Sequence, residues 1–580
     1  MAGHHSPEKA AKFAIRARMN HETMLYFLAA LVSMASIFIS YHFLRVLAGK
    51  TSRQNPEGRS SPPLAVARKI RSVLIRTAPA LPSFGHAGLV SLYVATNIVL
   101  TFAHVDYKNV GILSNLGSRT GWLAIANMLL VVFLALKNTP LAFLTSWSYE
   151  RLNVLHQVSG SMTLVHVILH VSLYCSYFVQ SGRPSRLLYT DEIFGMVAGL
   201  CFFGLAFSGI VVRRWWYELF YYMHICFWAV GVVMVGLHQP DFSKKIIFVT
   251  CVTGGIWGMD RLLRLARILM YSVSNEVTLQ PLSNGGTRVT LKKPPLGAMS
   301  GKHCFLWIPK IRSFETHPFT IAATDPMEFV IASYDGFTSE LHQYATRNPG
   351  ASLKASVDGS YGTFPAVDNC DKMILVAGGS GASFTFGTAL NALQKMKADD
   401  KKTIIFIWIV KQHSQLTWFA RHIKTLESDD RVSVRLYVTR APALEVEPAS
   451  PSESLMQKEL PVRRVTEDPE KDDHWTSEAR RSIDFEKGGA ISDSDAPSST
   501  MNGKVTATHS HIEDVPIIYR RPDVGDILRA TIIDETPVDR RVLVMGCGPD
   551  GLMRTVRDTS AACIRTEGPA VEVHCEQFGW

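Results

Sequence analysis

The sequence predicts a multidomain membrane protein: a bundle of about seven transmembrane helices, an antiparallel β-barrel, and a doubly wound α/β domain. Three observations predict this class. Apolar residues make up 47% of the 580 residues, and most of the excess precedes residue 260 in runs too long for core strands. Between residues 270 and 368 the apolar runs are short and separated by turn residues. From residue 370 onward, strand-like and helix-like segments alternate.

Seven apolar runs have about the length needed to cross about 30 Å of hydrocarbon, although the third and the last are short. They cover residues 23–46, 84–104, 119–136, 153–178, 192–212, 217–238 and 245–260. The first run lacks a small-residue cleavage site near its end, so we interpret it as a retained span rather than a signal peptide. We therefore divide this half into an N-terminal tail, 1–22, and a transmembrane domain, 23–262.

Charge and cysteine content exclude several classes of protein. The net charge is +10, although residues 441–515 contain sixteen acidic and eight basic residues. In a membrane protein such an excess is typical of basic cytoplasmic loops rather than of nucleic-acid binding. Basic clusters in the 47–83 connection, at Arg213–Arg214 and after residue 260 would share one side, which places the C-terminal half in the cytoplasm. The nine cysteines have no CxxC spacing, which argues against a disulfide or zinc framework.

Two of the spans contain histidines at the same interval. His156 and His170 are fourteen residues apart in the fourth span, as are His224 and His238 in the sixth. Fourteen residues are just under four helical turns, so each pair lies on one face, about 21 Å apart along the axis. The two spans run parallel, so His156 is expected level with His224, and His170 with His238.

Paired imidazoles at two depths are what two stacked six-coordinate haems require, and such ligation favours electron transfer. The alternative is that these histidines pack in the bundle or belong to a proton relay. His166 shares the face of His170 and competes for its role. Because it breaks the fourteen-residue match, we assign it to packing or to a haem propionate contact.

The duplicated histidine spacing on alternate helices, with Gly160 four residues after His156, resembles the ferric reductase transmembrane domain. That domain is shared by fungal ferric-chelate reductases, plant ferric reductases and the NADPH oxidases. The resemblance covers the second to seventh spans and implies two b-type haems, with His156, His170, His224 and His238 as the iron ligands.

Residues 270–368 have the short-strand pattern of an antiparallel β-barrel. His317-Pro318-Phe319-Thr320 is similar to the flavin-binding signature of the ferredoxin reductase superfamily. Gly336-Phe337-Thr338 resembles its diphosphate-facing element, and Asp358-Gly359-Ser360-Tyr361-Gly362 resembles its GPYG loop, with Ser360 where proline is usual. The resemblance implies FAD, with Pro318 and Phe319 near the isoalloxazine, Thr320 near its reactive nitrogen and His317 toward the pyrophosphate.

Residues 370–580 read as a doubly wound nucleotide-binding domain. An apolar strand is followed by Gly378, Gly379, Ser380 and Gly381 and then by a helix start, which suits a pyrophosphate. Cys547-Gly548-Pro549 resembles the family element beside the nicotinamide. The stretch 443–514 is polar and acidic, and we expect a disordered insertion there.

The last residues, CEQFGW, resemble the ending of fungal ferric reductases. In the superfamily a C-terminal aromatic covers the flavin, and Phe578 and Trp580 are the candidates, with ordinary packing as the alternative. The choice of NADPH over NADH rests on the resemblance, with Arg440 a candidate contact to the 2′-phosphate.

The resemblance as a whole implies a multi-pass plasma-membrane ferric-chelate reductase. It would pass electrons from cytosolic NADPH through FAD and two haems to extracellular ferric or cupric chelates, with an iron permease or oxidase as partner. Two alternatives stay open: an NADPH oxidase with oxygen as acceptor, and a channel-associated or transporter-associated subunit that has lost electron transfer. No nucleic acid is expected as a ligand, and the surroundings are membrane lipid.

Overall fold

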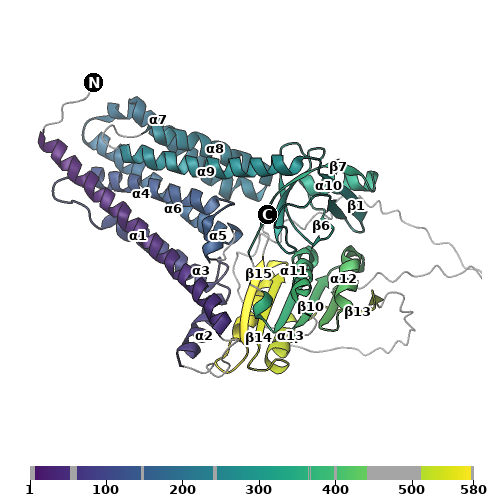
Figure 1. Cartoon of the computed structure of the whole chain (residues 1–580). Coiled ribbons are helices and arrows are strands. Elements are labelled where there is room, and N and C mark those ends of the chain that lie inside the picture. The colour runs from purple at the N-terminus through teal and green to yellow at the C-terminus, as the bar shows by residue number, and fades with distance from the viewer. Residues whose placement is uncertain are drawn as a thin grey trace, which may run out of the picture. The chain divides into compact units, whose positions relative to one another are not determined.

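The protein is described by a computed structural model that covers residues 7–51, 62–145, 149–238, 244–363, 365, 367–397, 401–440 and 511–576. Within these residues, seven helices are long and apolar enough to cross a membrane, which confirms the expected number of spans. They are α1 (Pro7–Thr51), α3 (Phe84–Phe102), α4 (Ile112–Ala135), α6 (Tyr149–Gln180), α7 (Thr190–Ile210), α8 (Tyr217–Leu237) and α9 (Lys244–Ser272) (Figure 1).

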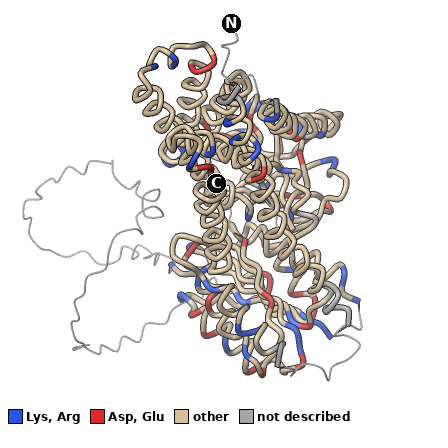
Figure 2. The backbone as a smooth tube through the Cα atoms, turned by 90° about the vertical axis from the view of Figure 1, so that its left-hand side faces the viewer, with Lys and Arg blue, Asp and Glu red and all other residues tan. Residues whose placement is uncertain are grey.

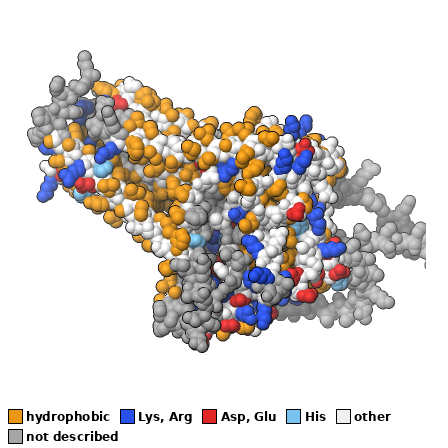
Figure 3. All heavy atoms as spheres, viewed as in Figure 1, with side chains coloured by type: hydrophobic (Ala, Val, Ile, Leu, Met, Phe, Trp, Pro, Cys, Tyr) orange, Lys and Arg blue, Asp and Glu red, His pale blue; other side chains and the backbone are white. Residues whose placement is uncertain are grey.

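Several helices extend beyond the apolar runs that predicted them. α1, α4 and α9 are all longer than expected because polar residues continue the helix where hydropathy alone ends it. The 47–83 connection, expected as a basic loop, contains the helix α2 (Pro62–Ile75). Charged residues are sparse along the bundle and frequent over the α/β domain (Figure 2), and hydrophobic side chains cover the visible face of the bundle (Figure 3).

A buried arginine joins the first three spans. Arg119 of α4 is 1% exposed and donates to the carbonyl oxygens of Leu100, Ala103 and His104 at the end of α3. It also donates to the Asn20 side chain of α1 at 2.7 Å. The last carbonyls of a helix have no partner within the helix, and a cation there is favoured. Arg119 therefore provides hydrogen-bond donors to the carbonyl oxygens at the end of α3, inside the bundle.

The next region folds as antiparallel strands, as expected. A five-stranded sheet has the order β5-β6-β2-β1-β7 and a three-stranded sheet the order β4-β3-β8. An Asn284-Gly285 turn with positive φ joins β1 to β2, as is common for an Asn-Gly pair in a hairpin. The elements are β1 (Glu276–Leu282), β2 (Gly286–Leu291), β3 (His303–Trp307), β4 (His317–Thr320), β5 (Ala323–Thr324), β6 (Met327–Ala332), α10 (Gly336–Arg347), β7 (Ser352–Lys354) and β8 (Ser356–Tyr361).

The C-terminal region is a doubly wound α/β domain, which confirms the third part of the fold. Its described strands have the order β12-β13-β11-β10-β9-β14-β15, parallel except for β12 against β13. Its elements are β9 (Lys372–Gly378), α11 (Ala382–Lys395), β10 (Thr403–Val410), α12 (Ala420–Glu427), β11 (Val432–Val438), β12 (His511–Ile512), β13 (Val515–Ile518), α13 (Val524–Arg529), β14 (Arg541–Cys547), α14 (Asp550–Ala562) and β15 (Ala570–Glu576).

The expected insertion 443–514 lies outside the described residues up to residue 510. Its last residues differ from the expectation, because His511–Ile512 forms β12 and turns through Glu513 and Asp514 into β13. A two-residue strand has no measurable periodicity, so sequence reasoning could not separate it from the polar stretch before it.

Candidate functional site

The structure brings the four histidines together in the expected pairs. His156 of α6 and His224 of α8 have ring centroids 6.4 Å apart, with an interplanar angle of 62°. His170 of α6 and His238, which directly follows α8, have centroids 6.1 Å apart at 77°. The two pairs are thus two separate sites at different levels of the same two helices.

One nitrogen of each ring is held by a backbone carbonyl. The Nδ1 atoms of His156, His170 and His238 lie 3.0, 2.7 and 2.6 Å from the carbonyl oxygens of Val131, Gly117 and Asp191, respectively. His224 Nδ1 lies 3.2 Å from Leu205 O. A carbonyl oxygen can only accept, so Nδ1 carries the proton and Nε2 keeps its lone pair for a metal.

The spacing of each pair suits an iron between two imidazoles. Metal–imidazole bonds of about 2 Å, plus the reach from each nitrogen to its ring centre, separate two trans rings by about 6 Å. Among the described residues no group of three or more His, Cys, Asp or Glu could hold a metal ion. Two ligands per site match a haem, whose porphyrin supplies the remaining four, and when bound it would provide a one-electron carrier.

His166 has different surroundings. Its Nδ1 lies 2.8 Å from Met162 O in its own helix, and its Nε2 lies 3.3 Å from the Thr101 hydroxyl. The ring is 2% exposed. Both nitrogens therefore have protein partners, which supports the packing assignment over a ligand role.

We call His156 and His224 the inner pair, and His170 and His238 the outer pair. Two glycines that sequence reasoning missed lie against the outer pair. A methyl group on Gly121 of α4 would lie 2.6 Å from His170 Nδ1, and one on Gly195 of α7 would lie 2.5 Å from His238 Cε1. A side chain at either position would overlap an imidazole. The spacing Gly117-x3-Gly121 in an apolar helix was the available signal, since small residues at that interval allow close helix contact.

Gly121→Ala is therefore expected to displace His170 and weaken binding of the outer haem by about 10- to 100-fold, as loss of a ligand-orienting contact does. Haem content of the purified protein measures the effect. The matched control is Gly254→Ala in α9, where a methyl group meets nothing within 4 Å. Equal haem content in the two variants would show that the close approach at Gly121 has no role.

The expected flavin residues gather around β4. His317 stacks on Phe337 with centroids 4.3 Å apart, and Phe337 lies 6.0 Å from Phe319. The HPFT segment and the Gly336-Phe337-Thr338 segment thus meet, with Gly336 at φ +56° and the N-terminus of α10 starting there. His317 Nε2 lies 3.1 Å from Glu315, and burial lowers the pKa of His317 from its usual value despite that carboxylate.

Strand β3 lies between β4 and β8, and the element expected as the loop 358–362 forms most of β8. Phe305 of β3 is opposite Pro318 on one side and Asp358 on the other. Gly359 and Gly362 have φ of +139° and +100°, which only glycine adopts readily. The side chain of Asp358 takes part in a network described below.

The two glycine elements of the α/β domain also meet. They follow the neighbouring parallel strands β9 and β14, at the carboxyl edge where such folds bind ligands. A methyl group on Gly381 would lie 2.3 Å from Cys547 O, and one on Gly378 would lie 2.7 Å from Pro549 Cδ. Trp408 Nε1 donates to Gly379 O at 3.0 Å and supports the turn before α11. Ser380 is within this turn, which ends at the helix start as expected.

The candidate contact to the 2′-phosphate lies within the described residues, whereas the two candidate aromatic residues over the flavin do not. Arg440 is exposed and follows β11, where its N–H donates to Lys411 O at the end of β10. It thus lies at the carboxyl edge of the sheet. Phe578 and Trp580 lie outside the described residues.

A cavity of about 1080 Å³ lies apart from these sites, between α1 and the helices α4, α6 and α9. Its lining is almost entirely apolar, with His21 and Lys245 as its ionisable side chains besides Tyr93, and none of the four paired histidines contributes to it. In a bilayer such a lining faces lipid chains, so the cavity carries no chemistry of its own.

Comparison with known proteins gives a consistent result. Three family models match: the ferric reductase-like transmembrane component at residues 120–235, an FAD-binding domain at 271–365, and the ferric reductase NAD-binding domain at 370–561. His156, His170 and His224 fall within the first range, and His238 lies just beyond its end. The β4 region and the two glycine elements fall within the second and third ranges, respectively.

Curated relatives come from fungi. Ferric/cupric reductase transmembrane component 2 of Saccharomyces cerevisiae is 24% identical over 484 residues, which are 81% of this chain and 62% of the relative. Ferric reductase transmembrane component 3 of the same species is 26% identical over 60% of this chain and 50% of the relative. A probable ferric reductase transmembrane component of Candida albicans is 25% identical over 57% of this chain and 50% of the relative. The matches thus span about half to three-fifths of these relatives' length.

The membrane bundle, the antiparallel β domain and the α/β domain thus match, in order along the sequence, a ferric reductase-like transmembrane component, an FAD-binding domain and a ferric reductase NAD-binding domain.

Proposed function

We propose that the protein is a plasma-membrane ferric-chelate reductase. It takes electrons from cytosolic NADPH, passes them through FAD and two b-type haems, and delivers them to ferric or cupric chelates outside the cell. Fungal relatives are named ferric/cupric reductase transmembrane components. The partner expected for this reaction is an iron permease or oxidase that takes up the reduced ion.

The observation that carries this proposal is the pair of stacked bis-imidazole sites. Each has centroids about 6 Å apart, as two imidazoles on one iron require. Each ring has its Nδ1 on a backbone carbonyl and its Nε2 available for a metal. Two such sites on α6 and α8 span most of the bilayer thickness, so a carrier in each would connect its two sides.

The other residues have binding and positioning roles in this proposal. FAD, when bound, accepts electrons in pairs from the nicotinamide and releases them singly. Phe319 and Phe337 provide an aromatic surface for the flavin, and Thr320 a hydroxyl. Gly378, Gly379 and Gly381 let the backbone approach a pyrophosphate at the start of α11.

The test uses membranes that contain the full-length protein, supplied with NADPH and ferric citrate, with and without superoxide dismutase. We expect formation of Fe(II) that superoxide dismutase does not reduce, together with a haem b band in the reduced-minus-oxidised spectrum. Loss of the Fe(II) signal with the dismutase would assign the protein as an NADPH oxidase with oxygen as acceptor. Absence of the haem band would exclude the transmembrane redox chain altogether.

A further inference from the structure

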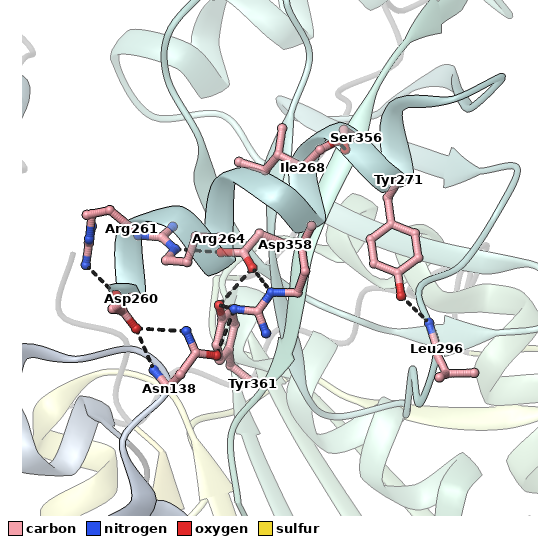
Figure 4. Close-up of polar contacts among 11 residues, drawn as sticks. Asn138, Asp260, Arg261, Arg264, Ile268, Tyr271, Leu296, Ser356, Asp358 and Tyr361 are labelled. Carbon is pink, nitrogen blue, oxygen red and sulfur yellow. Dashed lines mark hydrogen bonds and ion pairs between the residues drawn. The ribbon is translucent and has the colours of Figure 1, made fainter. Parts of the chain in front are cut away.

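The cytoplasmic end of α9 carries a group of polar side chains that the proposed reaction does not use. α9 has 29 residues, about 43 Å of helix, whereas a bilayer's hydrocarbon core is about 30 Å thick. Its last turns therefore extend beyond the hydrocarbon and lead directly into β1. Asp260, Arg261, Arg264 and Arg267 lie in this part of the helix. Figure 4 labels the first three of them.

Two of these arginines hold one fully buried carboxylate of the β domain. Asp358 of β8 is 0% exposed. Its Oδ2 accepts from Arg264 Nε at 2.6 Å, and its Oδ1 forms an ion pair with Arg267 Nε at 2.8 Å. The Tyr361 hydroxyl donates to Oδ1 at 2.8 Å and accepts from Arg267 at 2.6 Å. A buried carboxylate is stable only when paired and hydrogen-bonded in this way.

The same helix end is bound to the membrane bundle through Asn138, in the connection between α4 and α5 (Pro140–Thr145). The Asn138 backbone and side-chain N–H groups donate to Asp260 Oδ1 at 3.0 and 2.8 Å. Its side-chain oxygen accepts from Arg267 at 2.7 Å. Arg267 thus contacts Asn138 as well as Asp358 and Tyr361.

The neighbouring residue adds a second contact to the β domain. The Lys137 ammonium lies 4.5 Å from the centre of the Phe305 ring, and the Arg264 guanidinium lies 4.7 Å from it. Phe305 is 6% exposed and belongs to β3. The α4–α5 connection therefore contacts β3 directly, in addition to its contact with α9.

On the membrane side, this network begins at the helix that orients His156 of the inner pair. Val131 of α4 provides the carbonyl for His156 Nδ1 at 3.0 Å. Asn138 follows Val131 by seven residues and lies in the connection that follows the end of α4 at Ala135. A displacement of Asn138 relative to α9 therefore changes the position of His156 relative to the β domain, which α9 binds through Asp358.

On the cytoplasmic side, the network ends two strands from the flavin region. Asp358 is opposite Phe305, and Phe305 is opposite Pro318 of the HPFT segment. Adjacent strands are about 4.8 Å apart, so the backbone of Asp358 lies about 10 Å from that of Pro318. Because hydrogen bonds join the three strands, the position of Asp358 determines the position of the HPFT segment.

We propose that Asn138, Arg267 and Asp358 form a positioning network that holds the flavin-binding β domain at a set distance from the inner histidine pair, and thereby controls the rate of electron transfer between them. This inference rests on the proposed function for its rate consequence. Its structural part, the coupling of α4, α9 and β8, is independent of any bound cofactor. None of the three residues needs to touch the flavin or the haem.

Asn138→Ala tests the network at the residue farthest from the flavin region. The substitution removes the side-chain bonds to Asp260 and Arg267 and changes no charge. We expect flavin reduction by NADPH to stay within about twofold of the wild type in anaerobic stopped-flow measurements on the purified holoprotein. Haem reduction is expected to be at least about tenfold slower, because small displacements between reacting groups have large rate costs.

The second readout does not depend on electron transfer. Hydrogen–deuterium exchange of the full-length protein is expected to increase at least about tenfold in residues 262–272 and 356–361, with β9 unchanged, since loss of local contacts raises local opening. Asp260→Asn removes the carboxylate that accepts from Asn138, so it serves as a second variant if Asn138→Ala folds poorly. The matched control is Glu340→Gln, which removes the exposed Arg312–Glu340 ion pair of the same β domain.

Unchanged exchange in both network variants would overturn the proposal whether or not the protein reduces haem. Faster exchange with an unchanged rate of haem reduction would overturn the positioning role. Equal slowing of the flavin and haem steps would also overturn it, because that result indicates a damaged flavin site. If wild-type protein shows no haem reduction, the proposed function fails, and the exchange measurement still decides whether the network couples the two domains.

Discussion

His170→Ala is expected to remove the outer haem and to lower reduction of any membrane-impermeant acceptor by more than about 100-fold, since an electron would have to cross a gap that no carrier bridges. The ring centroids of His170 and His238 are 6.1 Å apart, and alanine would leave His238 without the imidazole that would help it to hold a haem. His156 of the inner pair precedes His170 by fourteen residues, about 21 Å of helix, in α6. Flavin reduction by NADPH should persist, because it requires only the cytoplasmic domains.

The measurement combines haem content, flavin bleaching by NADPH, and reduction of an impermeant ferric chelate. His166→Ala is the control, since both nitrogens of His166 are bonded to protein groups. That variant should keep both haems and most activity. Loss of the outer haem in His166→Ala, with retention in His170→Ala, would show that the fourteen-residue spacing identified the wrong ligand.

Gly381→Ala is expected to lower NADPH-dependent flavin reduction by at least about 100-fold, because misplacing a binding loop by about 1 Å has effects of this size. The added methyl group would lie 2.3 Å from Cys547 O and 2.6 Å from Cys547 C. Both are backbone atoms of β14 and cannot rotate away. The glycine turn and the Cys547–Pro549 element must then separate, and the turn that follows β9 loses its shape.

Chemical reduction by dithionite provides the internal check for this variant, because it bypasses NADPH and should reduce flavin and haem as in the wild type. The matched control is Gly551→Ala in the first turn of α14, where a methyl group meets nothing within 4 Å. NADPH-dependent reduction at the wild-type rate in Gly381→Ala would contradict the assignment of this turn to the nucleotide.

Much of the fold could be predicted from the sequence because the signals are local. A run of apolar residues has to cross the bilayer as a helix, whatever surrounds it, so seven spans follow from hydropathy. The order of strands and helices after residue 370 likewise follows from short-range periodicity. The predicted helix ends were less accurate. The polar ends of α1, α4 and α9 are stabilised by contacts to other helices and to the β domain, as at Arg16, Arg119 and Arg264.

For the histidine pairs, residue spacing predicts which rings lie at the same level, but it does not predict which carbonyl holds each ring. A fourteen-residue interval on two parallel helices predicts which rings share a level, because helix geometry depends on sequence position alone. The carbonyls that hold Nδ1 come from α4 and α7 and their ends, at separations of 19 to 53 residues. Which carbonyl reaches which ring depends on how four helices pack, and no local pattern contains that information.

By itself the sequence determined the three-part architecture, the two histidine levels and the two glycine-rich turns, since each depends on residues close together in the chain. Tertiary structure alone decided that Asp358, 94 and 91 residues from Arg264 and Arg267, is buried between them. It also decided that Gly121 lies against His170, and Gly381 against Cys547. Such pairings arise because burial brings segments that are distant in the sequence to van der Waals distance. The reason for a buried charge, or for a glycine at a given position, is then found only in the residue that lies against it.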